Sequence, residues 1–422
     1  MKKLYFTTLL SIAAISLVNA QTASGNGYVR CSSYEYEQQQ LATDPNFAAN
    51  QAAIESFTSN YVANHQNDAN ERSMITIPVV FHVLWHTAAQ NLSIARLTEQ
   101  INVLNKDYSG TNSDFNLVPA AWTSIAANCE IQFCLAQQDP SGNWTDGADR
   151  VNTANTSFDI SSDNAKSAAS GGADAWDRNK YLNIWVCNLS GGLLGYSTFP
   201  GGSASLDGCV LLYSAVGITG AISPYNKGRT ATHEIGHWLN MRHIWGDDGT
   251  SCAGSDAVSD TPNQSSENYG CPTFPHTDAC SPNSPGVMFM NYMDYTDDAC
   301  MYMFTNGQKT RMWATLNGSR AAIQTSTVCQ VTGVAEALLK GEFNIMPNPS
   351  ADGKFTVQFG NTDLKNLDIT VYNVVGQTIY TQHLDAILKS DMEIDLTGND
   401  PGVYFFELRS GNDKVVKKIM IQ

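Results

Sequence analysis

The stretch Thr230-Ala-Thr-His-Glu-Ile-Gly-His-Trp-Leu-Asn-Met-Arg-His243 combines three histidines and one glutamate at fixed spacing. On a helix, His233 and His237 lie four residues apart and share one face. Two imidazoles placed in this way can bind one metal ion, and the intervening Glu234 can reach a water on the same ion. His243 offers a third nitrogen if the helix ends soon after His237 and the chain turns back. Three protein ligands and one open position are typical of catalytic zinc, whereas structural zinc sites are closed with four ligands.

The full pattern resembles that of the metzincin zinc peptidases, which carry His-Glu-x-x-His-x-x-Gly-x-x-His and a methionine turn further along the chain. Trp238 and Leu239, together with the stretch Asn291-Tyr-Met-Asp-Tyr-Thr-Asp-Asp-Ala-Cys300, are similar to the pappalysin family, in particular its secreted bacterial members. The resemblance covers roughly residues 30–320. It implies a zinc-dependent endopeptidase that acts on proteins and peptides.

The expected mechanism follows from these residues. Zinc held by His233, His237 and His243 lowers the pKa of its water and polarises the scissile carbonyl. Glu234 then takes the proton of the zinc-bound water and returns it to the leaving amine, first as general base and then as general acid. By resemblance, Met293 is the methionine of the turn beneath the zinc, and Tyr295 donates a hydrogen bond to the oxyanion.

One residue departs from the family pattern. Asn240 stands where the family has the glycine that permits a positive φ at the turn between the second and third ligands. Asparagine is one of the few other residues that tolerate this region, at a cost of about 1 kcal/mol. The departure keeps one alternative open, a secreted binding protein with a degenerate, inactive zinc site. A second alternative is a zinc peptidase whose third ligand is a glutamate on a later helix.

The start of the chain predicts export. Lys2 and Lys3 precede an apolar run that ends at Val18-Asn-Ala20, which is typical of a cleaved signal peptide over residues 1–20. A membrane anchor is the alternative, although the run is short, and no other stretch of the mature chain is long enough to cross a bilayer. The net charge of −16 argues against a nucleic acid as partner.

Ten cysteines in an exported chain predict disulfides. Cys252, Cys271, Cys280 and Cys300 lie in the loop-rich stretch between the zinc helix and the end of the methionine turn, and their sequence positions allow three pairings. The family resemblance implies Cys252–Cys280 and Cys271–Cys300. The sequence does not determine the partners of a further set, namely Cys129, Cys134, Cys187, Cys209 and Cys329.

Residues 21–72 form a polar stretch that we interpret as a pro-segment, with a helix expected over residues 35–41. Its Arg30-Cys31 pair is similar to an element of the family's bacterial zymogens, in which a cysteine occupies the fourth zinc position as a cysteine switch. A disulfide to one of the unassigned cysteines is the other interpretation of Cys31. Arg72-Ser73 precedes the first strong strand and is a candidate activation site.

The central region predicts an α/β (α+β) catalytic domain of the metzincin type, with a mixed twisted sheet and the zinc-site helix. Residues 77–85, 129–136, 181–187 and 207–216 are typical of strands, and residues 93–106 and 304–316 of helices with Ser93 and Thr305 as N-caps. His82 and His86 share one strand face, and we interpret them as structural. Residues 193–196 are either a simple glycine-flanked loop or, by resemblance, the edge strand that pairs with substrate.

Two further features bear on ligands. Asp256 and Asp260 lie in oxygen-rich loops that could hold structural Ca²⁺, a cofactor that the family also uses, although no EF-hand spacing is present. Asp297 and Asp298 follow the methionine turn, near the expected pocket for the residue after the scissile bond. They favour a basic substrate side chain at that position.

The C-terminal residues have a different character. Alternating apolar positions between turn signals predict a small antiparallel β-sandwich. Pro347-Asn-Pro349, Gly402-Val-Tyr404 and the basic Lys417-Lys418 resemble the sorting domains of the type IX secretion system, which implies that machinery as a partner and a secreted or cell-surface protein. A carbohydrate- or protein-binding module is the alternative. The predicted organisation is signal peptide 1–20, pro-segment 21–72, zinc metallopeptidase domain 73–320, linker 321–341 and sorting domain 342–422.

Overall fold

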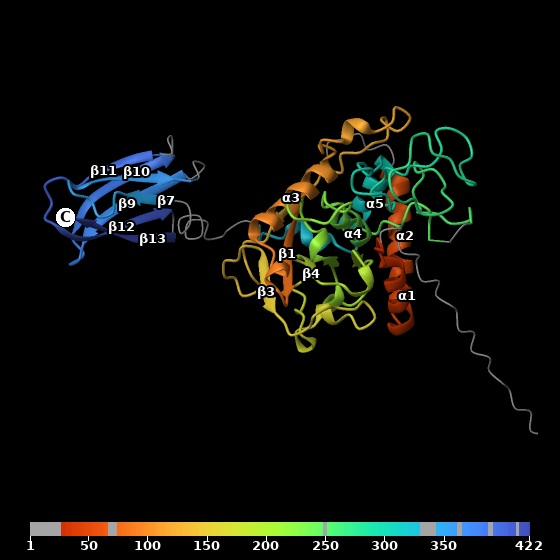
Figure 1. Cartoon of the computed structure of the whole chain (residues 1–422), viewed down its shortest axis with the longest axis horizontal. Coiled ribbons are helices and arrows are strands. Elements are labelled where there is room, and N and C mark those ends of the chain that lie inside the picture. Colours follow the sequence, from red (N-terminus) through yellow and green to blue (C-terminus); the bar gives the residue numbers. More distant parts are fainter. Residues whose placement is uncertain are drawn as a thin grey trace, which may run out of the picture. The chain divides into compact units, whose positions relative to one another are not determined.

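The computed structural model describes residues 27–65, 74–247, 251–329, 343–360, 365–386, 391–410 and 413–422. The predicted signal peptide, Arg72-Ser73 and most of the predicted linker lie outside these ranges. The chain divides into two compact units, one of Met1–Ala136 and Asp146–Ser326, the other of Gln137–Thr145 and Thr327–Gln422 (Figure 1). Among the described residues, none of the helices combines the length and apolar character that crossing a membrane requires.

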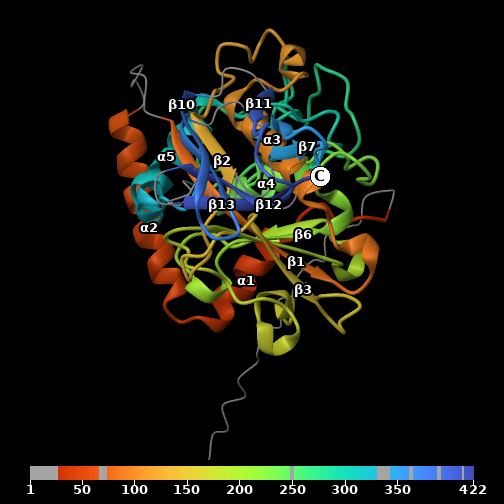
Figure 2. The same ribbon diagram turned by 90° about the vertical axis from the view of Figure 1, so that its left-hand side faces the viewer.

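The first unit contains a six-stranded mixed sheet. Its strands run in the order β2-β1-β4-β6-β5, and β3 also pairs with β1. All pairs are parallel except that of β5 with β6, which is antiparallel. Figure 2 shows β1, β3 and β6 from a second direction. The bounds are β1 Ile75–Trp85, β2 Ile131–Leu135, β3 Ala148–Asn152, β4 Leu182–Cys187, β5 Gly195–Ser197 and β6 Cys209–Leu212.

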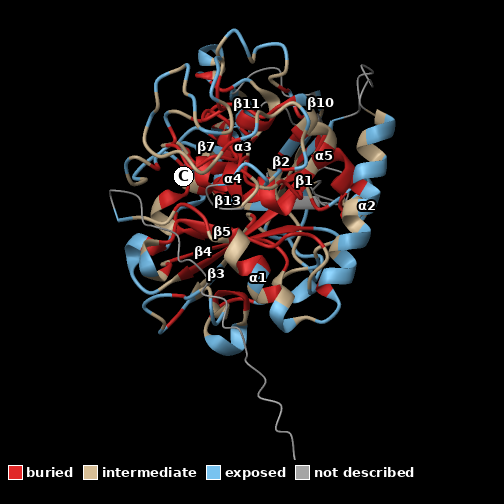
Figure 3. Ribbon diagram, turned by 90° about the vertical axis from the view of Figure 1, so that its right-hand side faces the viewer, coloured by how far each residue is buried: buried red, intermediate tan, exposed pale blue. Residues whose placement is uncertain are grey.

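Within the described ranges, five α-helices accompany this sheet. The bounds are α1 Ser33–Thr43, α2 Phe47–His65, α3 Ile94–Ser109, α4 Arg229–Trp238 and α5 Asn306–Asn317. Ser93 caps α3 by accepting from the Arg96 N–H, and Thr305 forms a capping box with Gln308 at the start of α5, as predicted. Helix α4 is buried along its whole length (Figure 3).

The structure differs from the predicted elements in three places. Strand β3 and the long helix α2 were not predicted, and β6 is much shorter than residues 207–216 because a 3₁₀ turn over Tyr213–Ala215 ends it. Helix α2 buries only Phe47 and Thr58 among its own residues, so it has no apolar stripe for a sequence pattern to detect. It lies beside α5, and its outer face is largely exposed (Figure 3).

The second unit contains two antiparallel sheets, as predicted. Their strand orders are β10-β9-β12-β13 and β11-β8-β7. One apolar core takes Phe355 and Val357 from the smaller sheet and Ile369 and Phe406 from the larger, which is the packing of a β-sandwich. The bounds are β7 Phe343–Met346, β8 Lys354–Phe359, β9 Lys365–Asn373, β10 Thr378–Ala386, β11 Asp391–Asp395, β12 Gly402–Ser410 and β13 Asp413–Ile421.

Candidate active site

The zinc motif lies on α4 and on the turn that follows it. The helix ends at Trp238, and the amide of Asn240 donates to the carbonyl of His237 at 2.8 Å. Asn240 itself adopts φ 67°, the left-handed conformation that the sequence predicted for this turn. The chain then doubles back and brings His243 to the helix face that carries His233 and His237. The substitution of the family glycine therefore leaves the turn intact.

The three histidines converge through their Nε2 atoms. These nitrogens are 3.1 Å apart for His233 and His237, 3.0 Å for His237 and His243, and 3.3 Å for His233 and His243. Nitrogens bound to zinc at 2.0–2.1 Å in a tetrahedron lie roughly 3.3–3.4 Å apart, so the spacing fits this metal. All three rings are fully buried, and no other hydrogen-bond partner satisfies their Nε2 atoms among the described residues. The donor set therefore fits zinc.

The opposite nitrogen of each ring has a fixed partner. Nδ1 of His233 lies 2.6 Å from the Tyr292 carbonyl, and Nδ1 of His237 lies 2.8 Å from the Met241 carbonyl. Nδ1 of His243 lies 2.5 Å from a carboxylate oxygen of Asp247. Acceptors at Nδ1 hold the proton there and leave the Nε2 lone pair free for a metal.

Met293 lies directly against the zinc helix. A Cβ added to Gly236 would come within 2.4 Å of the Met293 sulfur, so only glycine permits this close approach between the helix and the turn. The backbone amide of Met293 donates to the Asn291 side chain, which is itself bonded to Gln308 of α5. These bonds fix the turn against α4 at Gly236, and the role of Met293 remains a prediction.

Cys31, from the stretch predicted to be a pro-segment, lies at the same cluster. Its sulfur and one nitrogen of each histidine all lie within 4.8 Å of one another. Ser33 donates a hydrogen bond of 2.8 Å to Glu234 Oε2, and the Cys31 sulfur lies 3.5 Å from the same oxygen. Burial raises the pKa of Glu234 to about 7, although Ser33 and Cys31 act in the opposite direction. The other oxygen of Glu234 has no hydrogen-bond partner among the described residues.

Residues 29–32, within the predicted pro-segment, also run along the edge of the sheet. Val29 exchanges hydrogen bonds with Gly192 and Leu194, and the Ser32 amide donates to the Gly195 carbonyl at 3.2 Å. The pairing of Val29 with Leu193 is parallel. The residues that the sequence left open between a loop and a strand are therefore strand β5 and its preceding turn, and their outer backbone groups bind Val29 and Ser32.

Arg30 is buried beside Asp298. Its guanidinium lies 3.0 Å from the Asp298 carboxylate and 5.0 Å from the centre of the Tyr225 ring, and both charged side chains are fully buried. The second oxygen of Asp298 accepts from the backbone amides of Lys227 and Arg229. The carboxylate therefore lies at the first turn of α4, in a pocket filled by an arginine.

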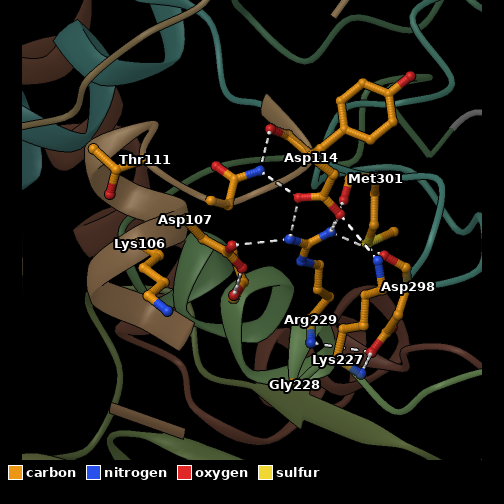
Figure 4. Close-up of polar contacts among 12 residues, drawn as sticks. Lys106, Asp107, Thr111, Asp114, Lys227, Gly228, Arg229, Asp298 and Met301 are labelled. Carbon is orange, nitrogen blue, oxygen red and sulfur yellow. Dashed lines mark hydrogen bonds and ion pairs between the residues drawn. The ribbon is translucent and has the colours of Figure 1, made fainter. Parts of the chain in front are cut away.

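A buried arginine holds this pocket in place. Figure 4 shows Arg229 between Asp107 and Asp114 on one side and the segment of Asp298 and Met301 on the other. Burial and the charge of Arg229 together shift the pKa values of Asp107 and Asp114 in opposite directions. The pKa of Asp107 is raised to about 6, mainly by burial, whereas that of Asp114 is lowered because Arg229 outweighs its burial.

Tyr295 lies next to the ligands. Its ring packs edge-on against His243 and Trp245, with centroids 4.9 and 4.8 Å away. Its hydroxyl donates to the carbonyl oxygen of Cys31 at 3.3 Å. The phenol therefore donates to a peptide carbonyl beside the histidine cluster.

The cysteines and His82 have the following partners. Cys252 is bonded to Cys280 and Cys271 to Cys300, the pairs that the resemblance implied. Cys134 and Cys329 are also in disulfide bonds. His82 is buried between Asp149 and Asn183. The free thiols are those of Cys31, Cys129, Cys187 and Cys209, so the alternative of a disulfide at Cys31 does not hold in this structure.

The predicted calcium loops receive no support. Asp256 accepts hydrogen bonds from Val258 and Thr261, and Asp260 caps α5 through Thr305 and the amide of Gly307. In the described parts of the chain, the group of His, Cys, Asp or Glu able to hold a metal is Cys31 with the three histidines. Calcium therefore remains a prediction.

Sequence reasoning missed several residues around the site. Ser33 contacts Glu234, Arg229 anchors the Asp298 segment, and Asp247 orients His243. Asp247 follows the third ligand by four residues, a spacing that could have indicated its role. No local signal distinguishes Ser33 or Arg229 from other polar residues.

Comparisons with known proteins show similarity to metalloproteases. The family model described as "Pregnancy-associated plasma protein-A", a peptidase family, matches residues 167–317, and the "Secretion system C-terminal sorting domain" model matches residues 344–422. A solved mutant of Tannerella forsythia promirolysin is 45% identical with a TM-score of 0.65, covering 72% of this chain and 99% of that one. Mature mirolysin of the same organism, in complex with a cleaved peptide, is 50% identical with a TM-score of 0.60, covering 62% and 99%. An extracellular metalloprotease of Uncinocarpus reesii is 33% identical over 324 residues, covering 74% of this chain and 97% of that protein.

Proposed function

Since this chain belongs to the pappalysin family of metallopeptidases, we propose that it is made as a latent zymogen and becomes a secreted zinc endopeptidase once its pro-segment is removed. One observation carries the proposal. The Nε2 atoms of His233, His237 and His243 converge at zinc spacing, with Glu234 beside them and the Cys31 sulfur at the same centre. The sorting domain matched over residues 344–422 directs the chain to a secretion system, here the type IX machinery.

Zinc, when bound by the three histidines, supplies a Lewis acid that makes water a nucleophile near neutral pH and polarises a peptide carbonyl. Glu234 takes a proton at a side-chain oxygen and returns it to the leaving amine. Removal of the pro-segment frees Oε2 of Glu234, which Ser33 and Cys31 contact in the zymogen. The carboxylate is fixed on α4 between two of the ligands, so it needs no rearrangement to meet a substrate.

Substrate binding in this proposal uses groups that the pro-segment engages. The backbone groups of Gly192, Leu194 and Gly195 bind an extended peptide by β-augmentation, as they bind residues 29–32. The Tyr295 hydroxyl donates to the oxyanion, a contact supported by its bond to the Cys31 carbonyl. One such donor contributes about 3–4 kcal/mol to transition-state stabilisation.

The pocket of Asp298 gives the proposed enzyme a preference for a basic residue after the scissile bond. Arg30 supports this assignment, because a buried guanidinium already fills the pocket and pairs with the carboxylate. Arginine suits a fixed carboxylate better than lysine does, because its planar fork donates in two directions. We therefore expect arginine to be favoured at this position.

Latency follows from the same contacts. Cys31 takes the fourth position at the histidine cluster, where it excludes catalytic water. Residues 29–32 cover the substrate edge, and Arg30 blocks the Asp298 pocket. A chain with Cys31→Ala should therefore be active before processing, whereas an equally latent zymogen would contradict the cysteine switch.

The test is hydrolysis of an arginine-containing peptide by the chain trimmed near Arg72, with and without 1,10-phenanthroline. We expect the chelator to abolish hydrolysis and Zn²⁺ to restore it. Glu234→Ala should bind one zinc per chain yet lose at least a hundredfold in rate, while Glu393→Ala on an exposed strand position serves as the matched control. Activity retained in Glu234→Ala would refute the assignment.

A further inference from the structure

Two arginines flank the turn that carries Asn240. Arg242 precedes the third histidine and forms an ion pair with Glu37, whose side chain is 3% exposed. Arg311 of α5 donates from Nε to the Asn240 carbonyl at 2.8 Å and forms a two-point pair with Glu55, at 2.8 and 2.6 Å. Both carboxylates come from the pro-segment helices α1 and α2, whereas both arginines belong to the catalytic domain.

Asn240 belongs to the same cluster. Its Nδ2 nitrogen is buried and has no acceptor within hydrogen-bond distance in the described part of the chain. Burial acts to raise the pKa of Glu55, but Arg311 and Arg242 outweigh it and the pKa is lowered. Asn240 and Glu55 line the same hollow.

The cluster borders a hollow between the pro-segment and the catalytic domain. Its volume is about 400 Å³, and its walls include Gln51 and Glu55 on one side and Asn240, Arg242 and Arg311 on the other. Arg242 also lies over the Phe199 ring, 4.4 Å from its centroid, which restricts its guanidinium. When α1 and α2 leave, the donors on the catalytic side lose their acceptors and face water.

We propose that Arg242, Arg311 and Asn240 form a subsite for an acidic side chain of the substrate, which Glu37 and Glu55 occupy in the zymogen. The inference rests on the proposed function, because it concerns the enzyme after pro-segment removal. The chemistry is that of guanidinium groups binding a carboxylate. The subsite adds a preference for an acidic substrate residue to the preference for a basic residue in the Asp298 pocket.

The path of the pro-segment gives the position of the acidic residue. Arg30 lies in the Asp298 pocket and Cys31 at the metal centre, so the residues after Cys31 leave on the side opposite to that pocket. In a substrate this is the side before the scissile bond. From Cys31 to Glu37 the chain has about two extended residues and four helical ones, roughly 13 Å, which an extended peptide covers in about four residues.

The experiment compares three pairs of peptides with the mature enzyme. All carry arginine after the scissile bond, and the two members of a pair differ only in having Glu or Gln at one position, which is three, four or five residues before the bond. We expect kcat/KM to be about tenfold higher for Glu at the best position, which corresponds to about 1.4 kcal/mol. Arg242→Gln should reduce this ratio severalfold, and Arg242→Gln with Arg311→Gln should bring it to about one. The control Arg150→Gln removes the same charge on β3 and should keep the wild-type ratio.

The outcomes distinguish failure of the subsite from failure of the peptidase assignment. A Glu-to-Gln ratio within twofold of one at all three positions, with chelator-sensitive cleavage of both peptides, would overturn the subsite and leave the peptidase assignment standing. A ratio that persists in the double variant would overturn it as well. Absence of any cleavage would refute the proposed function and the subsite together. Because Arg311 supports the Asn240 turn, thermal unfolding of each variant is measured to detect a loss of stability. The Glu-to-Gln ratio of the wild-type enzyme tests the subsite without any substitution.

Discussion

Replacement of Arg30 by alanine should release the pro-segment from the active site. The change removes a buried ion pair with Asp298, a bond of 3.2 Å to the Thr230 hydroxyl and the contact with the Tyr225 ring. Removing one partner of a buried pair costs about 3–5 kcal/mol. Asp298 keeps its two backbone donors from Lys227 and Arg229, so we expect a loss near the lower figure, about 3 kcal/mol. At 1.4 kcal/mol per decade, the open fraction of the zymogen rises about 100-fold.

The assay is chelator-sensitive hydrolysis of an arginine-containing peptide by the intact zymogen. Processing is suppressed by Arg72→Gln in every chain, and the integrity of the zymogen is followed on gels during the reaction. Arg30→Lys is the matched variant, since it keeps the charge but not the fork, and should fall between wild type and Arg30→Ala. If the rate of the intact Arg30→Ala zymogen stays within twofold of wild type, Arg30 does not hold the pro-segment and the pocket assignment loses its main support.

Two other perturbations test separate parts of the molecule. In the mature enzyme, Asp298→Asn should keep the fold, because an amide oxygen can still accept from the backbone amides of Lys227 and Arg229. The variant should lower kcat/KM for substrates with arginine after the scissile bond by about 100-fold, relative to substrates with an apolar residue there. Cleavage-site profiling that returns the wild-type preference would contradict this expectation. Burial raises the pKa of Asp256 to about 7 from an unfolded value of about 3.9, so its contribution to stability is fully present below about pH 4 and is lost as pH rises through 7. Asp256→Asn should remove this loss. In EDTA, the difference in free energy of unfolding between variant and wild type should be about 2–4 kcal/mol larger at pH 8 than at pH 4, whereas parallel pH profiles would refute the expectation. Added Ca²⁺ that stabilises wild type but not the variant at pH 8 would support the predicted calcium loop.

Local signals determined what could be predicted from the sequence. The ligand spacing and the positive φ at Asn240 follow from helix geometry and from the short list of residues that tolerate a left-handed turn. The caps Ser93 and Thr305 were likewise visible as side chains beside apolar periodicity. The roles of Met293 and Tyr295 came from the family resemblance and remain predictions, although Tyr295 does contact His243 and Cys31.

Contacts between distant segments could not be predicted in this way. Ser33 and Glu234 are 201 residues apart, and Arg30 and Asp298 are 268 apart. Nothing in the sequence near either member indicates the other. Helix α2 was missed for a related reason, because it is held by particular contacts such as that of Glu55 with Arg311 and has no apolar face of its own.

Asn240 combines a local signal in the sequence with contacts to distant segments. A glycine there would adopt φ 67° without the cost of about 1 kcal/mol that asparagine incurs. The backbone of Asn240 serves the turn and, through its carbonyl, binds Arg311, but a glycine would provide both contacts equally well. Only the side chain distinguishes the two residues, and Asn240 lines the same hollow as Glu55 and Arg311. In the subsite proposed above, this side chain supplies an amide donor next to Arg242 and Arg311, a role that glycine could not fill.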